Sequence, residues 1–413
     1  MSQFRVRNAV SPLRRRLPEA QPEALPQVDA LVAELRPEEP LHCLRPAVFA
    51  ATAAEFVAAF PGDTLYAVKC NPDPAVLRAL WNGGVRHFDC ASPAEIALVR
   101  QMFPAAEIHF MHPIKARGAI REAWMRHGVR DFVLDSMAEL AKIVEEVEAT
   151  GVDGQLGLVV RLALPKGEAV LDLSGKFGAA PKEAAALLCA ARPHVARLGI
   201  AFHVGSQCLE PLAWRRAIAL AGEVIQAARV RVDIVDIGGG FPVVYPDVEI
   251  PALGAIMAEI EDGFDRLGLP DARLWAEPGR ALVAGGGSVV VQVQARRGDM
   301  LFINDGVYGS LADAGALAFR YPARCIRPAG ETSATSRGFG FFGPTCDSAD
   351  VMQGPFFLPE DIAEGDWIEI GQLGAYGACL RTGFNGFDRA RMVEVADAPL
   401  DAPALPVAYT RAA

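Results

Sequence analysis

The sequence predicts an eight-stranded parallel β/α barrel followed by a separate β domain. From about residue 46 to residue 280, strand-like apolar runs alternate with Ala-, Leu- and Glu-rich stretches that have helical spacing. Eight such runs match the strand count of a closed barrel, and a doubly wound open sheet is the alternative. Beyond residue 281 the helical pattern stops, and short strands with turns indicate a second domain made of β-strands.

The elements follow in chain order. Residues 1–44 form an N-terminal segment rich in Pro, Glu, Ala and Arg, which we expect to be partly disordered. The barrel is expected over 45–280, with strands at 63–70, 85–91, 107–113, 131–136, 156–164, 197–205, 232–240 and 272–280. Within it, 136–150 has helical spacing, and Ser136 with Glu139 predicts a capping box at its start. The β domain is expected over 281–413, with strands within 286–298, 300–310, 365–373 and 390–398.

The composition argues against several classes of protein. Of 413 residues, 51% are hydrophobic and 22% are charged, as in an ordinary globular protein, and the net charge is -10. This charge argues against a nucleic-acid surface, since Arg14–Arg16 is a single short basic run. The eight cysteines form no CxxC pair, so no metal site is predicted and free thiols in the cytoplasm are expected. No secretion signal and no run of about 18 apolar residues is found, so no membrane span is expected.

Lys69 poses the first functional question, because it stands at the end of an expected buried strand, in LYAVKCNPDP. Burying an ammonium is costly, so a lysine that reaches solvent from a strand edge is the ordinary explanation. The alternative is an amine used in chemistry, most simply as a Schiff base. Other polar residues fall at the ends of later strands: Asp89, Arg161, His203, Ser206, Gly238 to Gly240, Glu277 and Arg280. Because a β/α barrel gathers its chemistry at these ends, their recurrence favours an active site.

Eight motifs, in order along the chain, resemble those of a known family. They are YAVKCNP, FDCAS, FHVGSQ, DIGGGFP, EPGR, DGVYGS, GPTCDSAD and LGAYG, spread over about residues 45 to 390. Together they resemble the motifs of the fold-type III pyridoxal-phosphate decarboxylases, and of bacterial ornithine decarboxylases in particular. The resemblance implies an alanine-racemase-like (β/α)8 barrel that binds pyridoxal 5'-phosphate, followed by a C-terminal β domain that the N-terminal segment joins. It also implies head-to-tail homodimers with active sites at the interface.

The resemblance implies a role for each residue of the site. Lys69 matches the lysine that binds the cofactor as a Schiff base, for which a desolvated amine with a lowered pKa is expected. His203 matches the histidine stacked on the pyridine ring, and Glu277 the carboxylate that keeps the pyridine nitrogen protonated. Asp89 matches a residue near the lysine, and Arg161 one near the phenolic oxygen of the ring. The phosphate cradle corresponds to Ser206, Gly238, Gly239, Gly240, Gly279, Arg280 and Tyr376.

The motif GPTCDSAD supplies the other half of the expected site. Cys346 resembles the cysteine that returns a proton to Cα after CO2 leaves, and Asp347 the carboxylate that binds the distal ammonium of the substrate. Taken alone, these would be an inert thiol and a turn-forming aspartate. In the family both residues reach the active site of the partner subunit. Tyr308 and Asp313 are expected on the substrate side, while the second distal carboxylate of eukaryotic relatives falls on Leu317 here.

The resemblance therefore implies decarboxylation of L-ornithine to putrescine and CO2 in polyamine biosynthesis. L-Lysine, or both substrates, is the alternative, because one methylene changes discrimination by only about 1–3 kcal/mol. Diaminopimelate is disfavoured, since decarboxylases of that substrate usually place Glu after the cysteine. A non-catalytic regulator of this fold need not keep Lys69 or Cys346, and a racemase commonly has Arg in place of Glu277, but this chain has all three residues.

Overall fold

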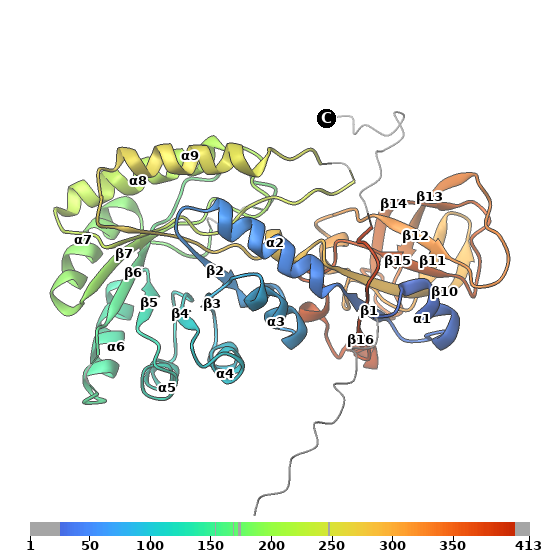
Figure 1. Ribbon diagram of the computed structural model, residues 1–413, viewed down its shortest axis with the longest axis horizontal. Helices are drawn as coiled ribbons and strands as arrows, with labels where there is room; N and C mark the ends of the chain where they lie inside the picture. Colours follow the sequence, from blue (N-terminus) through green and yellow to red (C-terminus); the bar gives the residue numbers. More distant parts are fainter. Residues whose placement is uncertain (1–24, 153, 168, 172–174, 247, 401–413) are drawn as a thin grey trace, which may run out of the picture.

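The computed structural model describes residues 25–152, 154–167, 169–171, 175–246 and 248–400. A barrel made by the first part of the chain and a β domain made by the last part lie side by side (Figure 1). The run Arg14–Arg16 and residues 1–24 of the expected N-terminal segment lie outside the described residues. No helix of the described part is both long and apolar enough to cross a membrane.

Eight parallel strands close the barrel in chain order, and the last pairs with the first. They are β2 (Asp63–Ala67), β3 (His87–Cys90), β4 (Glu107–Phe110), β5 (Asp131–Leu134), β6 (Gly157–Arg161), β7 (Arg197–Ala201), β8 (Ile234–Asp236) and β9 (Arg273–Ala276). The predicted barrel is confirmed, and the open-sheet alternative is wrong. Each expected segment contains one strand, but the strands are shorter than the segments.

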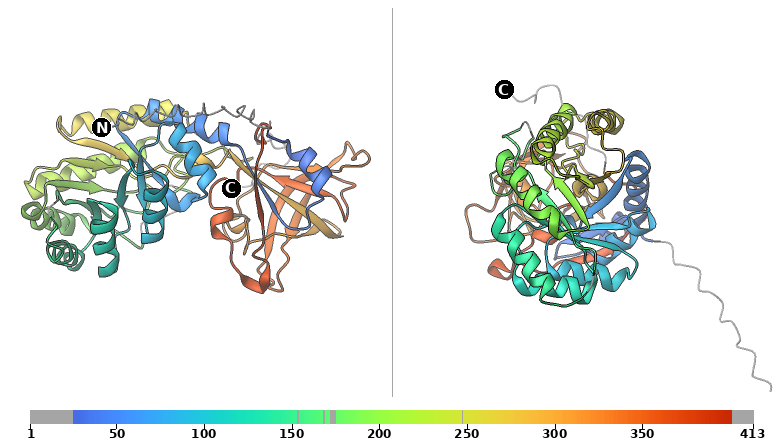
Figure 2. Two further views of the ribbon diagram at one scale, coloured as in Figure 1. Left: turned by 60° about the horizontal axis from the view of Figure 1, so that its bottom comes forward. Right: turned by 90° about the vertical axis from the view of Figure 1, so that its left-hand side faces the viewer.

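Helices surround the barrel, as the right-hand view of Figure 2 shows. They are α2 (Pro46–Ala59), α3 (Pro74–Asn82), α4 (Pro93–Met102), α5 (Arg117–His127), α6 (Met137–Glu148), α7 (Pro181–Ala191), α8 (Leu212–Ala228), α9 (Leu253–Arg266) and the short α10 (Arg280–Val283). Four of these helices begin with proline, which is suited to the first turn because the N–H it lacks has no partner there. Their apolar faces pack on the strands and form the largest hydrophobic core.

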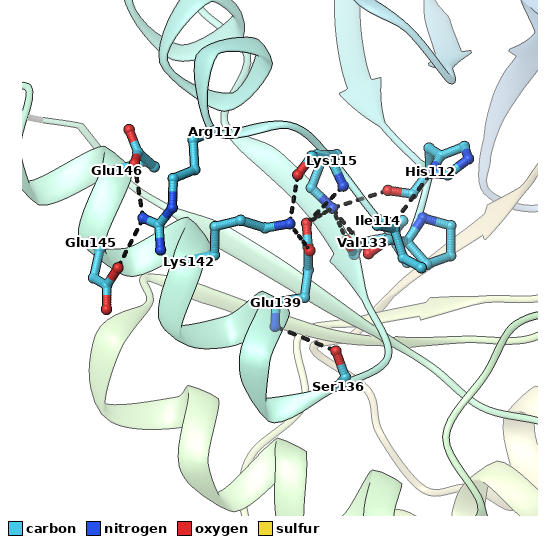
Figure 3. Close-up of polar contacts among 11 residues, drawn as sticks. His112, Ile114, Lys115, Arg117, Val133, Ser136, Glu139, Lys142, Glu145 and Glu146 are labelled. Carbon is cyan, nitrogen blue, oxygen red and sulfur yellow. Dashed lines mark hydrogen bonds and ion pairs between the residues drawn. The ribbon is translucent and has the colours of Figure 1, made fainter.

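A buried lysine fixes the loop after β4 (Figure 3). Lys115 Nζ donates to Val133 O at 2.6 Å and lies 3.0 Å from Glu139 Oε1. Glu139 is the residue expected in the capping box, and its backbone N–H donates to Ser136 Oγ at 3.3 Å. Its carboxylate binds Lys115 and Lys142, so the half of the predicted box that would return to Ser136 is not formed between these residues. The buried ammonium needs this counter-charge more than the helix end needs the second bond.

Apolar side chains fill the interior of the barrel. Leu65, Met111, Val133, Val159, Ala201, Ile234 and Trp275 pack inside it. Near the starts of the strands, His109 Nδ1 lies 3.1 Å from Asp131 Oδ2, and Arg197 Nη2 donates to Asp131 Oδ1 at 2.8 Å. This packing leaves the carboxyl ends of the strands as the place for a site.

The β domain is built on one sheet with the order β12-β15-β10-β11-β13-β14, and β1 pairs with both β10 and β16. The strands are β1 (Leu41–Leu44), β10 (Gly287–Arg297), β11 (Met300–Ile303), β12 (Ala323–Ile326), β13 (Ser336–Phe342), β14 (Val351–Pro359), β15 (Trp367–Ile370) and β16 (Arg391–Glu394). Strand β1 and helix α1 (Val28–Leu35), which precede the barrel in the chain, share a hydrophobic core with this sheet. The strands β12, β13 and β14 lie outside the four expected segments. Glycines inside β13 and β14 had hidden the alternating pattern of these two strands.

The two domains meet beside Lys69. Asn71 Nδ2 donates to Gly374 O at 2.8 Å, and the Tyr376 N–H donates to Cys70 O at 3.0 Å. Gly374 and Tyr376 belong to the LGAYG motif of the β domain. The β domain therefore helps to fix the turn that carries Lys69.

Candidate active site

Lys69 lies just beyond the end of β2, in a short 3-10 turn over Val68–Cys70. Its Nζ is 2.8 Å from Asp89 Oδ2, at the end of the neighbouring strand β3. The Lys69 side chain is 49% exposed, whereas that of Asp89 is 2% exposed. The ammonium of Lys69 is therefore paired with a buried carboxylate at the carboxyl ends of β2 and β3, while about half of the lysine side chain is exposed.

The charge on Lys69 is set by two carboxylates. Desolvation lowers the pKa of the Lys69 amine, but the charges of Asp89 and Glu277 raise it above its usual value. The expectation of a lowered pKa is therefore wrong for this arrangement of charges. The amine is held as an ammonium, and it becomes a nucleophile only when its proton leaves.

His203 and the turn at Gly238, Gly239 and Gly240, called the glycine turn below, lie next to each other in the site. His203 follows β7, and its Nδ1 accepts a hydrogen bond from the Gly205 N–H at 3.0 Å. Desolvation, with the nearby charge of Arg161, keeps the pKa of His203 well below its usual value, so its ring is neutral. A Cβ added to Gly239 would lie 2.6 Å from Glu277 O and 3.2 Å from His203 Nε2. Only glycine leaves the backbone this close to the imidazole and to the end of β9.

Two carboxylic acids lie together where β8 and β9 end. The Glu277 N–H donates to Gly238 O at 2.8 Å, and the Gly238 N–H donates to Asp236 Oδ1 at 2.8 Å. Desolvation and the charge of Asp236 raise the pKa of Glu277 well above its usual value, and desolvation raises the pKa of Asp236 to about 6. The pair therefore holds a proton near neutral pH, with Arg161 as a nearby positive charge.

Arg280 stands at the junction of the barrel and the β domain. Its Nη1 donates to Tyr245 Oη at 2.8 Å, and its Nη2 donates to Asp313 Oδ2 at 3.0 Å. Its guanidinium also lies 4.9 Å from the ring centroid of Tyr376, which places these two expected phosphate contacts together. Asp313 was expected on the substrate side, but its carboxylate is bound to Arg280.

Gly279 and Ser206 complete the expected phosphate cradle. A Cβ at Gly279 would lie 2.5 Å from Cys70 Sγ, so the turn before Arg280 packs directly on the turn that carries Lys69. The Ser206 N–H donates to Leu171 O at 3.0 Å, and its side chain is half-buried.

The second half of the expected site lies on two loops of the β domain. Tyr308 Oη donates to Asp347 Oδ2, and the Ala349 N–H donates to Asp347 Oδ1 at 3.0 Å. The Ala349 and Tyr308 hydrogen bonds lower the pKa of Asp347, so it is a carboxylate at neutral pH. Cys346 is exposed beside it. Among the described residues, no hydrogen bond or ion pair joins this group to Lys69, and we refer to the two groups of residues as half-sites.

Sequence reasoning missed three residues that shape these half-sites. Asp236 supports the glycine turn and contributes to the acidic pair, and its one signal was an acidic residue inside an apolar run. Asp350, 2% exposed, ties the loop of Cys346 to that of Tyr308. Asn385 accepts a hydrogen bond from the Cys346 N–H at 3.0 Å, although it is 39 residues away in the chain. No sequence pattern signals such a contact.

Comparison with known proteins identifies the two parts of the chain. Residues 48–284 match the family model described as pyridoxal-dependent decarboxylase, pyridoxal binding domain, and residues 284–374 match its C-terminal sheet domain. An ornithine decarboxylase of Panagrellus redivivus is 34% identical over 352 residues, covering 79% of this chain and 78% of that protein.

Two solved structures share the fold. A lysine/ornithine decarboxylase of Vibrio vulnificus, complexed with putrescine, has a TM-score of 0.77 and 30% identity, covering 89% of this chain and 97% of that one. An arginine decarboxylase of Paramecium bursaria Chlorella virus, bound to agmatine, has a TM-score of 0.77 and 28% identity, covering 89% and 98%.

The residues at the mouth of the barrel fit pyridoxal phosphate. Lys69 offers an amine to an aldehyde, and Arg280 offers a buried guanidinium whose Nε has no hydrogen-bond partner in the described part of the chain. Asp89 Oδ1 and Asp236 Oδ2 are buried and equally without partners there. A phosphate and a protonated ring nitrogen would provide partners for groups of this kind. Fold, site and relatives agree, and the chain belongs to the fold-type III pyridoxal-phosphate-dependent amino-acid decarboxylases.

Proposed function

We propose that the protein decarboxylates L-ornithine to putrescine and CO2, a step of polyamine biosynthesis. The observation that carries the proposal is the pair of Cys346 and Asp347 on one loop, with Asp347 ionised and held by Tyr308. A single carboxylate that has no cation among its contacts in the described part of the chain suits the simple distal ammonium of a diamino acid.

The residues of the barrel mouth would hold the cofactor. Lys69 would bind its aldehyde carbon, His203 would contact the ring, and Glu277 would interact with the pyridine nitrogen. Arg280, with the backbone of the glycine turn, would bind the phosphate. When bound, pyridoxal phosphate accepts the electron pair that the departing carboxylate leaves behind. The proton held by the Asp236–Glu277 pair suits this role, since a protonated ring nitrogen draws electrons more strongly.

The remaining steps belong to the side chains. Asp89 would stabilise the Lys69 ammonium when the amine of the substrate takes the place of the Lys69 amine. Asp347 binds the distal ammonium, and Cys346 delivers a proton to Cα after CO2 has left. Because these two residues lie on the β domain, apart from Lys69, we propose a homodimer in which each subunit completes the site of the other.

Ornithine, lysine and arginine differ as substrates in the length of the side chain that the site must accommodate. The named relatives act on ornithine, on lysine and ornithine, or on arginine. Asp313, which could have served as a second distal carboxylate, is bound to Arg280, and Leu317 is exposed. Lysine differs from ornithine by one methylene, worth about 1–3 kcal/mol. A lysine or dual activity is therefore the second candidate.

The test is CO2 release by the cofactor-loaded protein offered L-ornithine, L-lysine, L-arginine and meso-diaminopimelate side by side. We expect kcat/KM to be highest for ornithine. Preference for lysine would keep the mechanism and refute the substrate. Release from none of the four, with the cofactor's visible absorption present, would refute the proposed function altogether.

A further inference from the structure

The segment 382–387 of the β domain is braced by a nearly buried arginine next to it. Arg381 Nη1 lies 3.0 and 2.9 Å from the two carboxylate oxygens of Asp305, and it donates to Ser310 Oγ at 3.1 Å. Its Nη2 donates to Phe387 O at 3.1 Å and to Arg389 O at 3.0 Å. Asp305 is 1% exposed. This guanidinium therefore links the segment to the DGVYGS loop, which contains Asp305 and Ser310.

The same segment contacts the part of the site expected to bind the distal ammonium. The Thr382 N–H donates to Tyr308 O at 2.9 Å, and the ring centroids of Phe384 and Tyr308 are 4.8 Å apart. Tyr308 Oη in turn donates to Asp347. The position of Tyr308, and through it that of Asp347, is therefore set from segment 382–387.

Asn385 connects this segment to the cysteine. Its side-chain Oδ1 accepts a hydrogen bond from the Cys346 N–H at 3.0 Å. Its backbone is left-handed, with φ of 53°, and the next residue, Gly386, has φ of 79°. Asparagine is among the few residues that take this conformation readily, so the turn and the hydrogen bond are both matched to it.

We propose that Asn385 is a positioning residue that holds Cys346 where its thiol can protonate Cα. The inference deepens the proposed function and rests on it, because it concerns the same proton. Departure of CO2 leaves an electron pair shared between Cα and the cofactor. In the productive step this pair forms a C–H bond at Cα with the proton of the Cys346 thiol, and the thiolate takes a proton from water.

If the Cys346 thiol were displaced from Cα, the proton could be added at another carbon. The same electron pair can form a C–H bond at the carbon of the cofactor instead. Addition of water then releases an amino-aldehyde, and the cofactor remains as its amine form. Each such turnover gives CO2 without diamine and removes one active cofactor. The ratio of diamine to CO2 therefore reports where the proton goes, and a general loss of stability does not change it.

The experiment compares this ratio in the cofactor-loaded wild type, N385G and N385D. Glycine keeps the left-handed backbone and removes the acceptor oxygen, whereas aspartate keeps an acceptor for the Cys346 N–H. We expect one diamine per CO2 in the wild type and in N385D. In N385G we expect at least a ten-fold rise in the aldehyde product, with bleaching of the cofactor's visible absorption during turnover.

Several results would overturn the inference. A ratio of one in N385G with only a lower kcat would show a role in stability alone. A ratio of one with a raised KM would show that Asn385 acts on Asp347. Should N385G fail to give a folded protein by thermal melting, N385A removes the same acceptor and is measured in its place.

The proposed function fails on different results. A ratio of one in C346A would refute the cysteine as proton donor, and no CO2 from the wild type would refute the decarboxylase assignment. The inference falls with either of these.

Discussion

Replacing Asp350 should damage both the stability of the β domain and the candidate site. Asp350 Oδ1 accepts from the Val307 N–H at 2.8 Å, and Oδ2 accepts from the Thr345 N–H at 3.1 Å and from Thr345 Oγ1 at 2.7 Å. A Cβ at Gly306 or Gly343 would lie 2.1 Å from this carboxylate, so both loops close directly on it. The carboxylate is thus the shared anchor of the loops that carry Tyr308 and Cys346.

The magnitude follows from these bonds. Hydrogen bonds to a charged group contribute about 1.5–3 kcal/mol each, and D350A would leave three donors without an acceptor. Allowing for water entering the gap, we expect D350A to lower the free energy of unfolding by about 3–5 kcal/mol. In D350N one oxygen still serves Val307, but an NH2 group faces the two donors of Thr345, so we expect about 2 kcal/mol.

The assay is guanidinium denaturation of the cofactor-loaded protein, with kcat/KM for ornithine measured on the same samples. The matched control is D388A, since Asp388 is an exposed aspartate of the same domain. We expect the midpoint to fall in the order D388A, D350N, D350A, and kcat/KM to fall at least ten-fold in D350A. An unchanged midpoint and kcat/KM in D350A would show that the carboxylate does not anchor the loops.

Three further predictions concern the cofactor and the response to pH. Lys69→Ala should abolish both the visible absorption of the bound cofactor and turnover; retention of either would contradict the role of the lysine. Gly239→Ala, which brings a Cβ to 2.6 Å from Glu277 O, should raise the Kd of the cofactor at least ten-fold, whereas Gly254→Ala, with no atom within 4 Å of the added Cβ, should leave it unchanged. Desolvation lowers the pKa of His42 from 6.5 to about 4 in the folded protein. As the pH falls from 6.5 to 4, His42 becomes protonated in the unfolded chain while it is still neutral in the folded protein, so the free energy of unfolding decreases. At pH 5 the loss relative to pH 8 is about 2 kcal/mol, and His42→Gln should lose that much less in denaturant titrations at the two pH values; an equal loss would contradict a buried neutral histidine.

The barrel was predictable because its pattern is local. Runs such as 156–164 and 197–205 are mostly apolar, carry a polar residue near their ends and are separated by helical stretches, so each segment predicts a strand by itself. The β domain was predicted less completely. In β13, glycines stand at alternate positions, Gly338 and Gly340, and one of its two partner strands is β11, about 40 residues earlier in the chain. The predicted capping box was incomplete for the same reason: the Glu139 carboxylate binds Lys115, a residue of another loop, instead of returning to Ser136.

The sequence by itself determined the chemistry of this protein. Lys69, the glycine turn, Glu277 and Arg280 each follow a recognisable strand, and strand ends of one barrel must meet at one rim, so the residues proposed to bind the cofactor could be read in order. Tertiary structure alone decided how they are charged and held. The Lys69 pKa is raised by carboxylates from other strands, the Asp313 carboxylate binds Arg280, and Asn385 reaches Cys346 across 39 residues. Electrostatic fields and loop-to-loop hydrogen bonds depend on distances in space, which a linear pattern does not encode.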